Sequence, residues 1–304
     1  VALVRQMVNK YAAGPRKSLK GNFPAADPEV YPDAGLYHPT LKKRMTEDSA
    51  DIPAVKKPKG TVGLVLMRAY VLAGDTGHYD GVIKSLEARG VNVLPIFSSG
   101  LDIRPAVDQF LMKDGKPVVD AIISLAGFSL VGGPAYCNPE AAAEMLGDLD
   151  VPYISAQALE FQTLDEWQES DFGLLPIEAT MMVALPELDG ATGSMVFGGR
   201  GASGASMVAH PERVELLSSR VEKIVSLRNK AKQDRKIAVV IFNFPPNAGA
   251  TGTAANLDVF GSLFNTLKTL KADGYDVEIP ADSEALRQCV IAGNASKYGS
   301  EANV

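Results

Sequence analysis

From residue 61 onward, short apolar runs alternate with segments of helical spacing, and this alternation constrains the fold more than any other feature. Residues 61–67 form a continuous apolar run of strand length, and residues 78–89 carry apolar side chains at helical spacing before a glycine. Further strands are expected at 91–97, 118–125, 151–155 and 194–197, and further helices at 105–112, 139–146, 176–185 and 211–232. This order predicts an α/β fold, a Rossmann-like and mostly parallel sheet with helices on both faces.

Three regions are expected along the chain. Residues 1–58 mix Pro, Gly, Lys and Asp with little periodicity, which indicates an extended arm or the edge of a missing domain. Residues 59–232 form the α/β domain that carries the candidate site loops. Residues 233–304 are interpreted as the start of a second, truncated α/β domain.

The last region has the pattern of an incomplete sheet. Strands are expected at 236–244 and 276–279, with a helix at 254–272 between them. Two strands are too few for a complete sheet. Because the chain starts on Val1 and ends in a polar tail, truncation at both ends is expected.

Composition excludes several classes of protein. The net charge is -6 and the Lys and Arg residues are scattered, which argues against a nucleic-acid partner. Cys137 and Cys289 have no metal-ligand spacing, so we expect neither a disulfide framework nor a structural zinc site. No run approaches the length of a transmembrane helix and no signal peptide is recognisable, so a cytoplasmic protein is expected.

In doubly wound sheets, ligands bind outside the carboxyl ends of the strands, so the loops after strands are the candidate site loops. The loop at 68–78 follows the first strand and contains Asp75, Thr76 and His78. Asp75 or Thr76 can cap the next helix. His78 is one of three histidines and lies at the helix start, which favours a role in a site.

Two acids stand one residue apart in the turn at 186–190. In an extended segment the side chains of Glu187 and Asp189 share a face, so both carboxylates can converge on one cation or proton. An ordinary solvated turn is the alternative, and composition alone favours it.

Three glycine-rich loops are further candidates. The loop at 127–134 is apolar and can line a flat ligand, whereas the turn at 244–253 offers backbone N–H groups to an anion but lacks the lysine of a P-loop. Residues 199–204 spell G-x-G-x-x-G without a helix opening on the last glycine, which argues against a dinucleotide site. His38 is expected at the surface, and His210 and Trp167 are expected to have structural roles.

Taken together, these loops resemble the cobaltochelatase/magnesium chelatase large-subunit family, and the patterns at 124–134 and 244–246 are closer to the magnesium branch. The matching pieces are GLYHP at 35–39, GLVLMR at 63–68, GD at 74–75, HY at 78–79, LEARG at 86–90, PIF at 95–97, GF at 127–128, VGGP at 131–134, FQT at 161–163, ALPELDG at 184–190, FPP at 244–246 and GTAA at 252–255. The resemblance spans roughly residues 30 to 280.

The resemblance implies a porphyrin-binding subunit that inserts Mg²⁺ into protoporphyrin IX in chlorophyll or bacteriochlorophyll synthesis. The resemblance further implies two AAA+ partner subunits, I and D, that hydrolyse ATP for this insertion. It also implies a location in the bacterial cytoplasm or, alternatively, the chloroplast stroma. The alternatives are a cobaltochelatase subunit, or a docking domain for the AAA+ subunits that binds no tetrapyrrole.

The resemblance also suggests a role for each candidate residue. Glu187 and Asp189 would handle Mg²⁺, which prefers oxygen ligands, and His78 would accept a pyrrole proton, oriented by Asp75. The remaining expected ligand contacts are Arg68 with a propionate and Phe128, Gly132 and Gly133 with the macrocycle.

Overall fold

The computed structural model describes residues 2–24, 30–133, 135–244 and 250–298. Its main feature is an eight-stranded sheet with the strand order β12-β11-β10-β7-β3-β4-β1-β2. The strands are β1 Ala34–Tyr37, β2 Met45–Thr46, β3 Thr61–Val65, β4 Asn92–Ser98, β7 Ala121–Ser124, β10 Tyr153–Thr163, β11 Thr192–Arg200 and β12 Met207–Ala209. Two short hairpins lie outside this sheet, β5 Met112–Lys113 with β6 Lys116–Pro117, and β8 Gly132–Gly133 with β9 Tyr136–Cys137.

The five central strands, β11, β10, β7, β3 and β4, are parallel to one another. Parallel strands are covered by helices on both faces, which explains the continuous apolar runs in the sequence. In β3, for example, Val62 and Leu64 lie on one face of the sheet and Gly63 and Val65 on the other, and all four residues are buried. The mostly parallel α/β fold expected from the sequence is confirmed.

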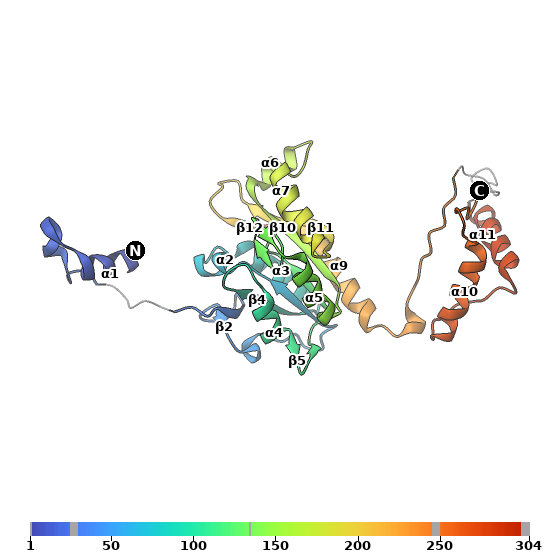
Figure 1. Ribbon diagram of the computed structural model, residues 1–304, viewed down its shortest axis with the longest axis horizontal. Helices are drawn as coiled ribbons and strands as arrows, with labels where there is room; N and C mark the ends of the chain where they lie inside the picture. The colour runs from blue at the N-terminus through green and yellow to red at the C-terminus, as the bar shows by residue number, and fades with distance from the viewer. Residues whose placement is uncertain (1, 25–29, 134, 245–249, 299–304) are drawn as a thin grey trace. The chain divides into compact units, whose positions relative to one another are not determined.

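Helices connect the parallel strands, as Figure 1 shows. They are α2 Arg68–Ala73, α3 Gly77–Ala88, α4 Arg104–Phe110, α5 Pro139–Leu149, α6 Leu164–Glu169, α7 Pro176–Glu178, the π-helix η3 Ala179–Ala184 and α8 Leu185–Leu188. Helix α9 Pro211–Asn229 follows β12, the last strand of the sheet. Helices α4 and α5 share one apolar core with the sheet, where Val107, Phe110 and Met145 are buried. Right-handed crossovers place α3 on the opposite face, because the chain reverses its direction across the sheet after β4.

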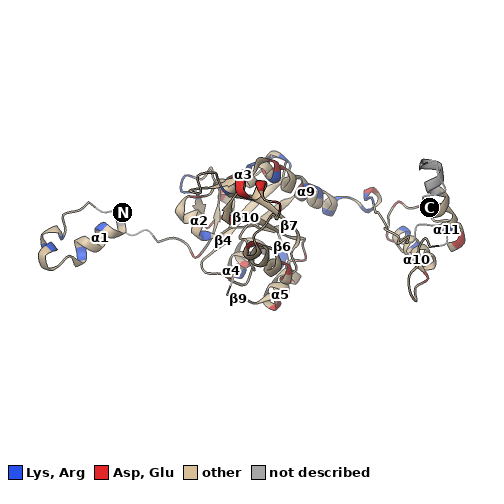
Figure 2. Ribbon diagram, turned by 90° about the horizontal axis from the view of Figure 1, so that it is seen from above, with Lys and Arg blue, Asp and Glu red and all other residues tan. Residues whose placement is uncertain are grey.

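Helix α3 packs closely against β12. A Cβ added at Gly77 would lie 2.8 Å from the carbonyl oxygen of Met207, and one at Gly81 would overlap Ala209. The two glycines therefore allow the backbone of α3 to approach this edge strand. Arg89, the residue after α3, pairs with Glu215 and Glu222 of α9. Figure 2 colours the acidic and basic positions of these helices.

Part of the segment expected to be an arm belongs to the main sheet. Strand β1 pairs antiparallel with β4 and with β2, and Leu36 and Tyr37 are fully buried. Residues 34–46 are therefore an edge of this sheet. The expected arm, residues 1–58, also contains the helices α1 Ala2–Tyr11, η1 Gly14–Leu19 and η2 Ser49–Asp51.

The chain folds as two compact units, Val1–Glu222 and Lys223–Val304. The second unit contains η4 Lys232–Asp234, α10 Val259–Ala272 and α11 Ser283–Tyr298. Among its described residues, 236–244 and 276–279 form no strand, so the expectation of strands there is wrong. A strand requires a pairing partner, and the described part of this unit supplies none for them.

Candidate functional site

A cavity of about 370 Å³ lies at the carboxyl ends of β3, β4 and β7. The connection from β3 leads to β4 on one side, and the chain then returns to β7 on the other side of β3. This is the topological switch point of the sheet, where doubly wound proteins bind ligands. The lining residues are Val65, Leu66, Met67, Arg68, Ala69, Leu72, Ser98, Gly100, Leu101, Asp102, Ile103, Ala126, Phe128, Ser129 and Leu130.

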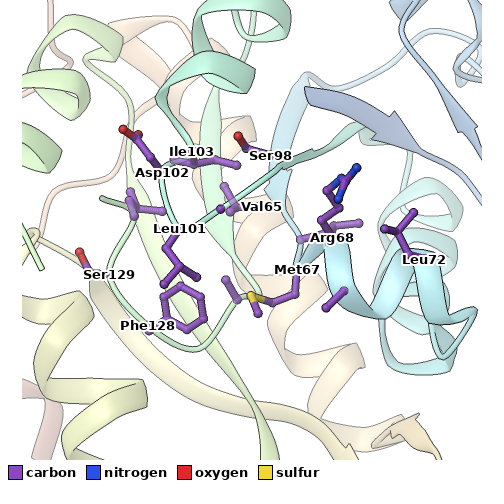
Figure 3. A pocket seen from close by; sticks show the side chains of 15 residues that line it. Val65, Met67, Arg68, Leu72, Ser98, Leu101, Asp102, Ile103, Phe128 and Ser129 are labelled. Atoms are coloured by element: carbon purple, nitrogen blue, oxygen red, sulfur yellow. The ribbon is translucent and has the colours of Figure 1, made fainter. Parts of the chain in front are cut away.

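The cavity has an apolar floor and a polar rim. Figure 3 shows Met67, Leu101 and Phe128 close together, with Arg68 on one side of this group and Asp102 on the other. Asp102 pairs with Arg104 at 2.6 Å, and this partner lowers the pKa of the Asp102 carboxyl. The rim therefore presents a guanidinium on one side and a paired carboxylate on another.

Arg68 begins helix α2 and lines the cavity, as expected for an anion-binding residue. Its Nε donates to the carbonyl oxygen of Pro32 at 3.0 Å, and one terminal nitrogen donates to that of Tyr31 at 3.3 Å. These bonds hold the side chain at the rim. A guanidinium has five N–H donors, and the bonds to described residues use two of those of Arg68. The others can bind a carboxylate ligand.

Phe128 also lines the cavity, from the loop after β7. Asp189 holds the next two residues, because its carboxylate accepts hydrogen bonds from Ser129 Oγ at 3.0 Å and from the backbone N–H of Leu130 at 2.7 Å. The Asp189 side chain is buried, and burial raises its pKa. Both of its oxygens are therefore engaged by the cavity loop.

Glu187 and Asp189 do not share a face. Residues Leu185–Leu188 form helix α8, and Asp189 retains helical backbone angles, so the expectation of an extended segment is wrong. Side chains two residues apart on a helix point in different directions, and Glu187 is exposed whereas Asp189 is buried. Across the described ranges, no group of three acidic, histidine or cysteine side chains is arranged to hold a metal ion.

His78 is fully buried beside the sheet and does not line the cavity. Its ring stacks on Phe197 with centroids 5.9 Å apart and contacts Tyr79 and Tyr70 at 3.8 and 5.1 Å. Neither ring nitrogen has a hydrogen-bond partner among the described residues, and burial lowers the pKa of His78 from 6.5 to about 3. The ring is therefore neutral at pH 7. Because it is also buried, its role as a proton acceptor stays a prediction that requires the ring to become accessible.

The loop before His78 has a structural role that the sequence did not show. Asp75 Oδ1 accepts a hydrogen bond from the backbone N–H of Met207 at 3.0 Å, which ties the loop to β12. Thr76 is the residue before α3, but its side chain does not cap the helix and instead accepts from Tyr37 Oη at 2.8 Å. The expected capping by Asp75 or Thr76 is therefore wrong, and within the described ranges no hydrogen bond joins Asp75 to the ring of His78.

Gly132 and Gly133 form strand β8 and line a second hollow of about 490 Å³ that shares Leu101 and Asp102 with the first. Gly132 has a φ of 102°, and a Cβ there would lie 2.9 Å from Cys137 Cα. This close approach requires glycine. Pro134, the last residue of the expected loop, lies outside the described residues.

The other two histidines and two glycine-rich segments lie outside the cavity lining. His38 is buried and bonds Glu87 at 3.0 Å, so the expectation of a surface histidine is wrong. His210 bonds Gln168 at 3.1 Å and its ring contacts that of Trp167, as expected for side chains with structural roles. Residues 199–204 lead from β11 into β12 without a helix, and residues 245–249 of the expected anion-binding turn lie outside the described residues.

The sequence did not identify the part of the cavity wall that follows β4. Ser98 ends that strand, and Asp102 and Ile103 lie on the loop after it. The only signal for this wall is the general rule that ligands bind after parallel strands. The loop carries no cluster of polar residues that would single it out among the loops at that edge.

The fold defines a doubly wound α/β protein with a small, partly apolar cavity at its switch point. The chain belongs to the CobN/Magnesium Chelatase family, whose model matches residues 2–303. None of the helices in the described ranges is long and apolar enough to cross a membrane.

Similar proteins include the magnesium-chelatase H subunit of Cereibacter sphaeroides, which is 46% identical over 99% of this chain and 27% of its own length. The magnesium-chelatase ChlH subunit of Oryza sativa subsp. indica, a chloroplastic protein, is 43% identical over 93% of this chain and 22% of its own length. The chain thus spans about a quarter of the length of these relatives.

A solved structure has the same fold. The catalytic subunit of cobaltochelatase from Mycobacterium tuberculosis matches with a TM-score of 0.66 and 24% identity, covering 90% of this chain and 22% of that one. At 24% identity the likeness shows a shared fold and nothing beyond it.

Proposed function

We propose that this chain is part of the porphyrin-binding subunit of a magnesium chelatase, in which Mg²⁺ is inserted into protoporphyrin IX for chlorophyll or bacteriochlorophyll synthesis. The observation that carries the proposal is the 46% identity to a magnesium-chelatase H subunit over 99% of the chain. ATP hydrolysis belongs to separate AAA+ subunits, I and D, in the bacterial cytoplasm or the chloroplast stroma. Bacteriochlorophyll synthesis in a bacterium is the preferred setting.

The cavity at the switch point suits one edge of a porphyrin. Its volume of about 370 Å³ is near the lower end of the range of ligand sites, about 300–1,000 Å³. Phe128 and Leu101 would contact the flat macrocycle, and the guanidinium of Arg68 would pair with a propionate. Gly132 and Gly133 would face the part of the ligand that extends into the second hollow.

Metal insertion requires that Mg²⁺ lose water and that two pyrrole N–H protons be removed. Glu187 is an exposed carboxylate, which suits delivery of the hydrated substrate ion, whereas Asp189 is buried and engaged by backbone. We retain Glu187 for this step. His78 would accept a proton only after the contact with Tyr70 of α2 opens, because that ring covers one side of the imidazole.

The role of Arg68 is tested with the full-length subunit and two ligands, deuteroporphyrin and its dimethyl ester. Arg68→Ala is expected to weaken binding of the free acid by about 10- to 100-fold, because a hydrogen bond to a charged group contributes roughly 1.5–3 kcal/mol. The ester lacks the carboxylate, so its affinity should change little. Dissociation constants come from quenching of tryptophan fluorescence.

Arg16→Ala serves as the matched control, since Arg16 is an exposed arginine outside the cavity lining. An equal loss for acid and ester, or no loss for either, would contradict the assignment of Arg68. If the wild-type subunit bound the AAA+ subunits through this region but no porphyrin, a docking domain would replace the proposed function.

A further inference from the structure

We propose that Asp189 is a positioning residue: it fixes the backbone of Ser129 and Leu130 and thereby sets the Phe128 wall of the cavity for the flat, apolar macrocycle of a tetrapyrrole. The inference rests on the proposed function. It assigns Asp189 a role different from the Mg²⁺ ligand expected from the resemblance.

The hydrogen bonds from Ser129 and Leu130 link two parts of the chain that are about sixty residues apart in sequence. Leu130 and Ser129 are themselves buried, with 2% of each exposed, as is Asp189. Ser129 Oγ lies 3.2 Å from the carbonyl oxygen of Val131, so the loop has an internal contact as well. The carboxylate is therefore a fixed acceptor beneath the cavity wall.

The segment that ends at Asp189 contacts the loop at a second point. The π-helix η3 carries Met182, whose carbonyl oxygen accepts a hydrogen bond from Gln157 Nε2 at 2.9 Å. The Met182 side chain packs over Gly127, where an added Cβ would lie 3.6 Å from Met182 Cγ. The consecutive helices α7, η3 and α8 thus hold both ends of the residues around Phe128.

The chemistry of the contact separates positioning from metal binding. Asparagine retains one acceptor for the Leu130 N–H, and its amide can donate to Ser129 Oγ, so Asp189→Asn keeps the loop in place. Alanine removes both acceptors and leaves a buried N–H without a partner, which frees the loop. A Mg²⁺ ligand or proton acceptor needs the charged carboxylate and would fail in both variants.

The experiment uses the full-length subunit assembled with its AAA+ subunits, in the Asp189→Asn, Asp189→Ala and Ser129→Ala variants. Three quantities are measured: the porphyrin dissociation constant, kcat, and KM for Mg²⁺. We expect Asp189→Ala to raise the porphyrin dissociation constant about tenfold with KM for Mg²⁺ unchanged, and Asp189→Asn to stay within about twofold of wild type. Ser129→Ala removes one of the two contacts and should lie between them.

Asp171→Asn is the matched control, because Asp171 is an exposed acid outside the cavity lining. Equal loss of kcat in the Asn and Ala variants, with porphyrin affinity unchanged, would overturn the inference in favour of a carboxylate in the metal step. If the wild-type subunit binds no porphyrin, the proposed function fails together with the inference. If Asp189→Ala does not fold, Ser129→Ala and Asp189→Asn decide between the two roles by the same measurements.

Discussion

At the scale of single residues, His78 is the least satisfied side chain near the site. Neither nitrogen of this buried imidazole has a partner among the described residues, so the ring lacks the hydrogen bonds that water would give it. Its neighbours Tyr70, Tyr79 and Phe197 offer aromatic contacts instead. Folding therefore fixes the neutral form of the ring.

This residue should make the chain sensitive to acid. The folded-state pKa of about 3 lies below the ordinary value of 6.5, so below pH 6.5 the unfolded state binds a proton that the folded state does not. The free energy of unfolding should fall by about 1.4 kcal/mol per pH unit between pH 6.5 and 3 on account of this group. His78→Phe should remove that part of the slope.

Urea unfolding at about pH 7 and about pH 4.5, on either side of the ordinary histidine pKa, measures the effect. His210→Asn is the control, since His210 is a partly exposed histidine with hydrogen-bond partners and should leave the slope as in wild type. A His78→Phe variant with the full wild-type slope would contradict the buried, neutral ring.

At the scale of elements, the apolar pattern of the sequence predicted the buried parallel strands but not which other segments pair as strands. The parallel strands were found because burial on both faces leaves continuous apolar runs. Arg68 and Phe128 line the cavity because they follow such strands. Strand β1 was missed, and strands at 236–244 and 276–279 were wrongly expected, because pairing depends on distant partners. The pairing of Glu187 with Asp189 failed for a related reason: whether two residues share a face depends on helix or strand geometry.

The contact of α3 with β12 gives a second prediction. Gly77→Ala should destabilise the chain by about 1–3 kcal/mol, because the new methyl group meets the Met207 carbonyl and forces the helix away from the strand. Gly147→Ala in α5 is the matched control, since nothing lies within 4 Å of the added atom. That substitution should stabilise by about 0.5–1 kcal/mol. Chemical denaturation measures both, and a neutral Gly77→Ala would contradict the close approach.

At the scale of the whole molecule, the second unit leaves apolar side chains exposed at 236–244. Val240 is 95% exposed and Phe242 62%, within a run whose composition is typical of a strand. The run forms no strand in the described part of this unit, and the chain spans about a quarter of the length of its relatives. Because a strand forms only with a partner, we expect the run to pair in the full-length subunit.

Val240→Lys tests this expectation in two lengths of chain. In the full-length subunit it should lower the unfolding temperature, because a lysine would replace a valine covered by the sheet. In the 304-residue chain it should have little effect. Val30→Lys is the control, since Val30 is 93% exposed. Hydrogen exchange should show protection of amides 237–243 in the longer chain alone, and equal exchange in both would contradict the pairing.

The placement of the cavity between the ends of β3, β4 and β7 has a consequence for how such a site can diverge. Each wall of the cavity is a loop that follows a different strand. Mutation can therefore change the length or sequence of one loop while the hydrogen-bonded sheet stays unchanged. Selection for a new ligand can therefore act on one wall at a time. A family with both magnesium- and cobalt-named members is then expected to keep its sheet and to vary in these three loops.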